Sequence, residues 1–382
     1  MSASSTSAIE LAQHLAQQFA ARADEADRLG KLPNEDVQAL KDSGYLGLSV
    51  PQEYGGQGLS LKECVAAHLE LAQGSGSTAM VAGMQLHLFG HASETRPWPE
   101  PTFARLCQAA VNGGLFNNVA SEPLLGSPSR GGLPATTAAP TPTGEGWMVN
   151  GHKTWTTGGK HLTHMLVTVR IEDDPALMLV RQDTPGVAWV ETWSDSLSLR
   201  ASDSHDVYFK EVAVPADYLI QRGMTPAQSA PNAWFPTVMS TVYLGTAIAA
   251  RNTVIQYALE RVPTALGKPI ATLPKIQRQI GEIDLALQAA QALLFEVAGE
   301  WTGEAENRRR IYPRIVAVKH LITETANEVT DKALRIAGGL SLTKSLPLER
   351  YFRDVRAGLM QPPSGDTALE IIGQNAIEQR KR

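Results

Sequence analysis

Residues 150–160 read Asn-Gly-His-Lys-Thr-Trp-Thr-Thr-Gly-Gly-Lys. The dipeptide Asn150-Gly151 is the pattern that favours a two-residue β-hairpin turn. The indole of Trp155 follows beside threonine hydroxyls and two glycines, where a ligand can come close to the backbone. A flat heterocycle with a polar rim needs such an apolar wall for one face and hydrogen-bond partners at its edge. The same pattern also fits a plain β-hairpin with a partly buried tryptophan, so both interpretations stay open at this point.

The sequence around this stretch carries a β pattern. From about residue 115 to 215, short runs rich in β-branched residues alternate with Gly and Pro turns, which predicts a small antiparallel β domain. These runs cover residues 147–149, 165–169, 176–180, 187–190 and 207–214. Residues 128–146 are rich in Pro, Thr and Gly, and we expect them to form a loop.

Both flanks of the β region have a helical period. From Ile9 to about Val111, and again from about Phe235 onward, apolar residues recur at every third or fourth position. Residues 1–7 are expected to form a short frayed tail. We therefore predict an α+β chain with three parts. They are an N-terminal helical domain (1–112), a central β domain (113–225) and a C-terminal helical bundle (226–382).

Composition excludes several classes of protein. The chain has 382 residues with 43% hydrophobic residues and a formal net charge of -5, so it carries no basic footprint for nucleic acid. Its two cysteines, Cys64 and Cys107, exclude a disulfide framework and a cysteine-built zinc site, and they fit a reducing compartment. No apolar run reaches the roughly 18 residues of a membrane helix, and no secretory signal is visible. We expect a cytoplasmic protein without a metal, a membrane or a nucleic-acid partner.

The sequence has no dinucleotide, phosphate-loop, nucleophile-elbow or zinc-protease motif, and the S-x-x-K of Ser341 and Lys344 lacks its companion motifs. Five segments, taken in order, nevertheless resemble the acyl-CoA dehydrogenase superfamily of FAD enzymes. The segments are 46–56 (LGLSVPQEYGG), 121–127 (SEPLLGS), 153–158 (KTWTTG), 199–215 and 337–354. Pro128 departs from the family pattern, which has an Asp there. The resemblance runs from about Leu32 to Gly373, and it implies FAD as cofactor, a central antiparallel β-barrel domain and a C-terminal four-helix bundle.

The resemblance also assigns roles to residues of this chain. The pyrimidine edge of the flavin ring would be lined by Asn118, Ala120 and Ser121, and its far face by Trp155, Thr156 and Thr157. The adenine half of FAD would be held partly by a neighbouring subunit, which implies a homodimer or homotetramer. The candidates for contacts with the adenine half of FAD are Arg261, Gln277, Gly338 and Gly339. The Gly338-Gly339 turn also fits a helix C-cap, and both interpretations can hold together. Substrate contacts are assigned to Ser127 and Phe235. Arg353 and Asp354 are expected to pair with each other.

The base of the family reaction is missing from its usual position. That reaction needs a carboxylate that removes a proton next to a thioester carbonyl while hydride passes to flavin. The loop after Asp354 ends in Gln361-Pro362-Pro363-Ser364-Gly365-Asp366, and the base position falls on Pro362 or on Ser364. A second position used in the family falls near Phe235, where there is no acid. Asp366 is the nearest carboxylate, either as a relocated base or as the cap of a helix that begins at Thr367.

Three functions remain open. The first is FAD-dependent oxidation of an acyl-CoA-like thioester, with an electron-transfer flavoprotein as partner. The second is a two-component monooxygenase that receives reduced flavin, FAD or FMN, from a flavin reductase and oxidises a small aromatic or sulfur compound. It would need an apolar pocket with a hydrogen-bonding group, for which His87 is the candidate, and His91 shares its helix face. The third is a flavin-binding paralogue without activity.

Overall fold

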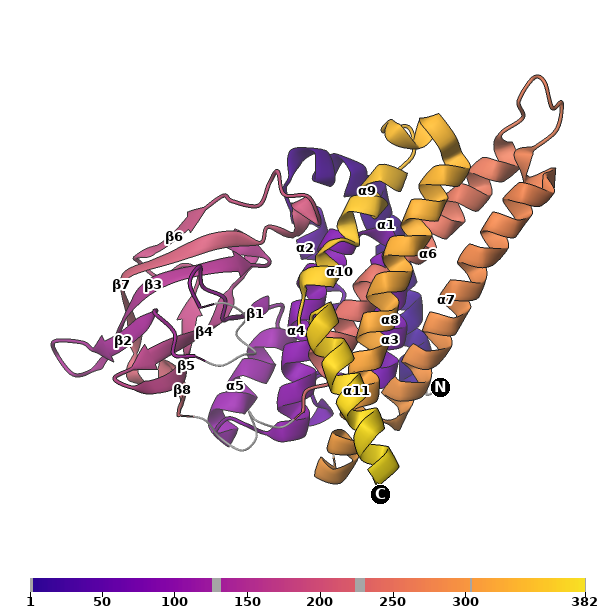
Figure 1. Cartoon of the computed structure of the whole chain (residues 1–382). Coiled ribbons are helices and arrows are strands. Elements are labelled where there is room, and N and C mark those ends of the chain that lie inside the picture. The colour runs from indigo at the N-terminus through magenta and orange to yellow at the C-terminus, as the bar shows by residue number, and fades with distance from the viewer. Residues whose placement is uncertain (1–2, 126–131, 224–230, 303, 382) are drawn as a thin grey trace.

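The computed structural model describes residues 3–125, 132–223, 231–302 and 304–381. Helices come first and last along the chain, and the strands lie between them. Figure 1 shows the strands gathered on one side of the molecule and the long helices on the other. The order of helices, strands and helices predicted from the sequence is therefore present.

Five α-helices precede the sheet in the described part of the chain. They are α1 (Ala3–Leu29), α2 (Asn34–Asp42), α3 (Leu61–Gly74), α4 (Gly76–Thr95) and α5 (Glu100–Val111). Helix α1 already begins at Ala3, so the frayed tail expected over residues 1–7 is wrong. Ser60 and Glu63 form a capping box that starts α3, and the Ser75 hydroxyl accepts from the Thr78 N–H to start α4. Helix α4 is buried over nearly its whole length, so it forms the middle of this part of the molecule.

Eight strands form one sheet in the order β6-β7-β3-β2-β4-β5-β8, with β1 added beside β4. Their bounds are β1 (Phe116–Val119), β2 (Thr137–Pro140), β3 (Gly146–Thr156), β4 (His164–Ile171), β5 (Asp174–Arg181), β6 (Val187–Val190), β7 (His205–Pro215) and β8 (Leu219–Arg222). Most pairs are antiparallel as predicted, but β1 and β2 each run parallel to β4. Strand β2 lies inside 128–146, so the prediction of a loop over that whole segment is wrong.

The Asn150-Gly151 dipeptide does not form a hairpin turn. It lies in the middle of β3, where the register with β7 shifts between Val149 and Gly151 as in a β-bulge. The Asn150 side chain accepts a hydrogen bond of 2.8 Å from the Glu211 N–H of β7. A Cβ on Gly151 would lie 2.4 Å from the hydroxyl of Thr136, so the glycine is required by close packing. The hairpin prediction is therefore wrong, because the dipeptide continues β3 opposite a bulge in β7, where Lys210 and Glu211 face the single residue Asn150.

The C-terminal part is built on four long helices. These are α6 (Trp234–Glu260), α7 (Pro274–Glu300), α8 (Ala305–Ala337) and α11 (Gly365–Lys381), with the shorter α9 (Leu348–Asp354) and α10 (Ala357–Met360) between the last two. Helices α6, α7 and α8 pack against one another, and α11 packs on α8, so the predicted four-helix bundle is present.

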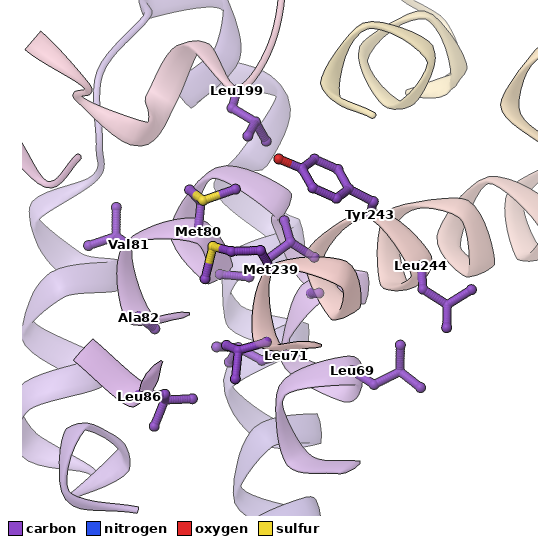
Figure 2. Packing of buried hydrophobic residues seen from close by; sticks show 14 of the residues in the cluster. Leu69, Leu71, Met80, Val81, Ala82, Leu86, Leu199, Met239, Tyr243 and Leu244 are labelled. Carbon is purple, nitrogen blue, oxygen red and sulfur yellow. The ribbon is translucent and has the colours of Figure 1, made fainter. Parts of the chain in front are cut away.

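The core crosses from the N-terminal helices to the C-terminal bundle. Figure 2 shows Met80 of α4 beside Met239 of α6, with the Tyr243 ring of α6 directed toward Leu199 of the sheet region. All four side chains are at most 3% exposed. Buried side chains from the N-terminal helices, the sheet and the C-terminal helices belong to one continuous core. Burial of each large side chain stabilises this core by about 1.5–3 kcal/mol.

A polar junction ties α9 to α1 and to the sheet region. The Arg353 guanidinium donates to the Asp27 carboxylate at 2.6 and 3.0 Å, and Arg350 donates to Asp24 at 2.8 Å. The buried Asp354 carboxylate accepts from the Leu199 N–H at 2.8 Å. Burial raises the pKa of Asp354 to about 6, although Arg350 opposes this. The expected Arg353–Asp354 pair is therefore wrong, because each side chain bonds to a different part of the chain.

Candidate functional site

The segment around Trp155 exposes an indole beside unused hydroxyls. Trp155 has a left-handed backbone (φ 55°), which is uncommon for a residue with a side chain, and it is 62% exposed. The hydroxyl oxygens of Thr154 and Thr156 are buried and have no hydrogen-bond partner within the described ranges. The exposed aromatic face suits a planar ligand.

Hydrogen bonds hold the end of this segment in place. The Thr157 hydroxyl bonds to the Ser204 hydroxyl at 2.9 Å, and the Thr157 carbonyl accepts from the Asn117 side chain at 2.9 Å. The side-chain oxygen of Asn117 has no partner among the described residues. Thr157 is thus fixed between β1 and the loop before β7.

A buried ion pair fastens the Ser121 loop to β3. Lys153 Nζ donates to the Glu122 carboxylate at 2.7 Å and to the Thr168 hydroxyl at 3.0 Å, and both charged side chains are almost fully buried. The Glu122 carboxylate also accepts from the N–H groups of Ala135 (2.7 Å) and Thr136 (3.0 Å). Burial alone would raise the pKa of Glu122, but these hydrogen bonds outweigh it and lower the pKa. The sequence analysis missed this pair, although both residues lie in the two quoted motifs.

The loop that carries Ala120 and Ser121 is held next to Trp155. The Ser121 carbonyl accepts from the Thr154 N–H at 3.0 Å. Lys153 Nζ also lies 3.5 Å from the Ala120 carbonyl. The structure therefore brings together Ala120, Ser121, Trp155, Thr156 and Thr157, which the sequence assigned to one flavin ring.

A cavity of about 160 Å³ opens between α4, the sheet and the start of α6. It is lined by His87, Leu88, His91, Ala92, Pro97, Trp98, Asn118, Leu166, Thr168, Leu177 and Asn232. Asn118 of β1 pairs in register with Leu166 of β4, so the cavity connects the predicted flavin edge with His87. The Phe235 ring meets the His87 ring edge-on, with centroids 5.0 Å apart. Leu166 and Thr168 are two positions apart in β4, so their side chains point to the same face of the strand, toward the cavity. This alternation along residues 165–169 could have predicted that the two residues share a site.

Both cavity histidines are neutral near pH 7. Burial lowers the pKa of His87 to about 3, with a further contribution from His91. Burial and the nearby Arg308 lower the pKa of His91 to about 4. The Arg308 guanidinium donates to the Glu94 carbonyl at 3.1 Å and lies 3.6 Å from the Glu94 carboxylate. That carboxylate also accepts from the indole N–H groups of Trp234 (2.7 Å) and Trp301 (3.0 Å), which fixes the end of α4 behind the cavity.

The loop at the expected base position offers no acid to this cavity. The Gln361 side chain approaches the sulfur of Met80 at 3.7 Å, and its own oxygen has no partner in the described part of the chain. The Ser364 carbonyl accepts from the Ala368 N–H, which places Ser364 at the start of α11. Asp366 is exposed in the first turn of that helix, which begins at Gly365, so the predicted cap of a helix at Thr367 is wrong.

The four residues assigned to the adenine half lie at one end of the bundle. Arg261 follows the end of α6, Gln277 lies in the first turn of α7, and Gly338 and Gly339 follow α8. Gly338 has φ 64° and is the C-cap of α8, so the predicted alternative of a C-cap is confirmed. A Cβ on either glycine would meet no described atom within 4 Å, so this turn faces open space. Ser127 lies outside the described residues.

Models of three acyl-CoA dehydrogenase domains match the chain in the same order as its three parts. The N-terminal domain matches residues 7–94, the middle domain 119–212 and the C-terminal domain 237–360. The chain belongs to the acyl-CoA dehydrogenase family. This confirms the family, the fold and the flavoprotein oxidoreductase class predicted from the sequence, and it agrees with the predicted flavin cofactor.

Relatives in the family carry different activities in their names. "Putative acyl-CoA dehydrogenase YdbM" from Bacillus subtilis (strain 168) is 37% identical over 367 residues, which cover 95% of each chain. L-evernosamine nitrososynthase from Micromonospora sp. is 28% identical, over 97% of this chain and 89% of its own. The dibenzothiophene monooxygenase structure from Paenibacillus sp. A11-2 is similar with a TM-score of 0.84 at 23% identity, over 97% of both chains. That structural likeness shows the fold alone. None of the described helices is long and apolar enough to cross a membrane.

Proposed function

We propose that this family member is the oxygenase component of a two-component system. It would accept reduced flavin from a separate reductase and oxidise a small molecule with oxygen. The observation that carries the proposal is the cavity beside Asn118. Its described lining holds two neutral histidines, the buried His87 and the half-buried His91, and no carboxylate, which suits an oxygenase better than an enzyme that removes a proton with an acid side chain.

The residues around Trp155 fit a flavin ring. The exposed indole would cover one face of the ring. The Lys153–Glu122 pair would hold the Ser121 loop at the opposite edge. Bound reduced flavin would supply the two electrons of the reaction, in which one oxygen atom enters the substrate and the other leaves as water.

The cavity residues would bind the substrate and exclude water. Leu88, Leu166 and Leu177 give the cavity apolar walls, which keep water from the reacting groups. A neutral imidazole offers one donor and one acceptor, so His87 can hold or pass a proton at its ring nitrogens without carrying a charge. The edge-on Phe235 ring would keep the His87 ring in one orientation.

A second candidate is oxidation of an acyl-CoA thioester, which is favoured by the name of the 37% identical relative. The geometry supports it less well. Pro362 and Pro363 supply neither a carboxylate nor a backbone N–H that could stabilise a developing negative charge. Asp366, the relocated base predicted from the sequence, points from an exposed turn and does not line the cavity.

Two assays separate these functions. The protein is first supplied with FMN or FAD, a flavin reductase and NADH under oxygen, and substrate-dependent oxygen uptake and oxygenated product are measured. The protein with oxidised FAD is then mixed with a panel of acyl-CoA thioesters without oxygen. We expect product only in the first assay. If an acyl-CoA bleaches FAD, and if this bleaching is lost in the Asp366→Asn variant, the protein is a dehydrogenase. If neither assay gives a signal, the protein binds flavin without activity.

His87→Gln tests the assignment of the cavity. Loss of a positioned proton-transfer group typically costs about 10²–10⁴-fold in rate, so product formation should fall by at least tenfold. Reduced flavin should still be consumed, with its electrons released as hydrogen peroxide. His14→Gln on the exposed face of α1 is the matched control and should behave as the unmodified protein. Equal product yields from the two variants would contradict the role of His87.

A further inference from the structure

We infer that the cavity beside α4 selects a compact, uncharged molecule with one aromatic ring and one hydrogen-bonding substituent. This inference rests on the proposed function, because it names the substrate class of the same site. The names of the relatives imply substrates of several chemical classes, and the inference narrows the substrate of this chain to one of them.

The volume sets the size of the occupant. At about 160 Å³ the cavity is close to the engineered cavity of roughly 150 Å³ that binds benzene in another protein. Pockets that enclose drug-sized ligands measure about 300–1,000 Å³. One six-membered ring with a small substituent therefore matches this volume, whereas a second fused ring would extend beyond it.

The lining sets the charge. Its described residues include no Lys, Arg, Asp or Glu, and both imidazoles are neutral at pH 7 because burial lowers their pKa values. The Arg308 guanidinium is held at Glu94 and does not line the cavity. An anion that entered would lose its hydration without gaining a cation, which is unfavourable by several kcal/mol.

The polar atoms set the substituent. Leu88 and Trp98 from the helical side and Leu166 and Leu177 from the sheet line the cavity, so a ring inside it would contact apolar side chains. The remaining lining carries polar side chains, among them Asn118 and Asn232. A hydroxyl or ring N–H on the ligand can hydrogen-bond with these amides, and so offset the loss of its own hydration.

The test is binding of three matched probes to the full-length protein. Phenol, benzoate and 2-naphthol are titrated at pH 7 by isothermal calorimetry, with and without FMN. We expect saturable one-to-one binding of phenol and at least tenfold weaker binding of both benzoate, which adds a charge, and 2-naphthol, which adds a ring. Binding of benzoate as tight as that of phenol would overturn the assignment of charge, and equal binding of 2-naphthol would overturn the assignment of size.

Two variants place the binding in this cavity. Ala92→Phe fills the cavity and should abolish phenol binding, whereas Ala21→Phe on the exposed face of α1 should leave it unchanged. Trp98→Ala enlarges the cavity and should tighten 2-naphthol binding at least tenfold, which keeps the test decisive if Ala92→Phe fails to fold. Phenol binding that survives in folded Ala92→Phe, or unchanged 2-naphthol binding in Trp98→Ala, would contradict the inference.

The outcomes also separate this inference from the proposed function. Phenol binding without any oxygen-dependent product would leave the cavity assignment standing and refute the oxygenase. Oxygen-dependent turnover of a charged or larger compound, together with no phenol binding, would refute the cavity assignment and leave the oxygenase standing.

Discussion

Lys153→Met should destabilise the sheet region far more than loss of an ordinary surface ion pair. Methionine keeps most of the apolar length of the lysine but removes the ammonium that lies 2.7 Å from Glu122. The side chains of Lys153 and Glu122 are 0% and 3% exposed, so the variant leaves a buried carboxylate whose charge is unpaired. Breaking one partner of a buried pair costs about 3–5 kcal/mol. We expect a loss of that size in the free energy of unfolding, measured by urea titration with tryptophan fluorescence and circular dichroism.

Lys160→Met is the matched control. Lys160 lies 3.6 Å from Glu191, and the two side chains are 58% and 51% exposed, so this pair contributes only about 0–1 kcal/mol. Adding Glu122→Gln to Lys153→Met removes the unpaired charge and keeps an acceptor for the backbone N–H groups, so it should recover at least about 1 kcal/mol. The reasoning is refuted if Lys153→Met costs no more than Lys160→Met, or if the second substitution adds a further full loss.

Three further predictions concern the bulge, the support of α4 and acid stability. Gly151→Ala places a Cβ 2.4 Å from the Thr136 hydroxyl and should cost about 1–3 kcal/mol in a urea titration; an unchanged midpoint would contradict the close packing. Glu94→Leu leaves a buried guanidinium without its carboxylate and should lower stability by about 3 kcal/mol, with a change in the near-ultraviolet dichroism of the two indoles that donate to it. His87 and His91 have folded-state pKa values below the usual 6.5, so their contribution is present above pH 6.5 and is lost as the pH falls toward 4. Between pH 5.5 and 4.5 the unfolding free energy should fall about 2–3 kcal/mol more steeply per pH unit in the unmodified protein than in the double Gln variant, and equal slopes would refute the burial of both rings.

The sequence predicted the main elements because they repeat their signal over many residues. Five of the eight described strands follow from short β-branched runs, and the long helical stretches from about Phe235 onward follow from apolar periods, whereas the four-helix bundle followed from the resemblance to the family. Predictions from two or three residues failed where a contact with a distant part of the chain decides the local structure. Asn150-Gly151 has the composition of a hairpin turn, but it continues β3 opposite a bulge in β7, where its contacts are the Glu211 N–H and Thr136.

The candidate site was predictable in part for the same reason. The flavin segments lie in two contiguous motifs, so their proximity followed from the resemblance to the family. The cavity draws on α4, on β1, β4 and β5, and on Asn232 near the start of α6, and no linear pattern joins these parts. His87 was predicted because its segment faces the substrate in the family that the chain resembles, whereas Trp98 and Leu177 enter the cavity only through tertiary packing. Arg353 likewise has its partner 326 positions away, and the adjacent Asp354 could not reveal that.

The bonds between α1 and α9 have a consequence for synthesis of the protein. Asp24 and Asp27 leave the ribosome early, but Arg350 and Arg353 follow 326 positions later. At a translation rate of about 5–20 residues per second, the two acidic side chains wait roughly 15–65 seconds for their partners. During that interval the first helices expose the apolar surface that later packs on α6. Nascent chains of this protein should therefore depend on chaperones until nearly the last helix has emerged.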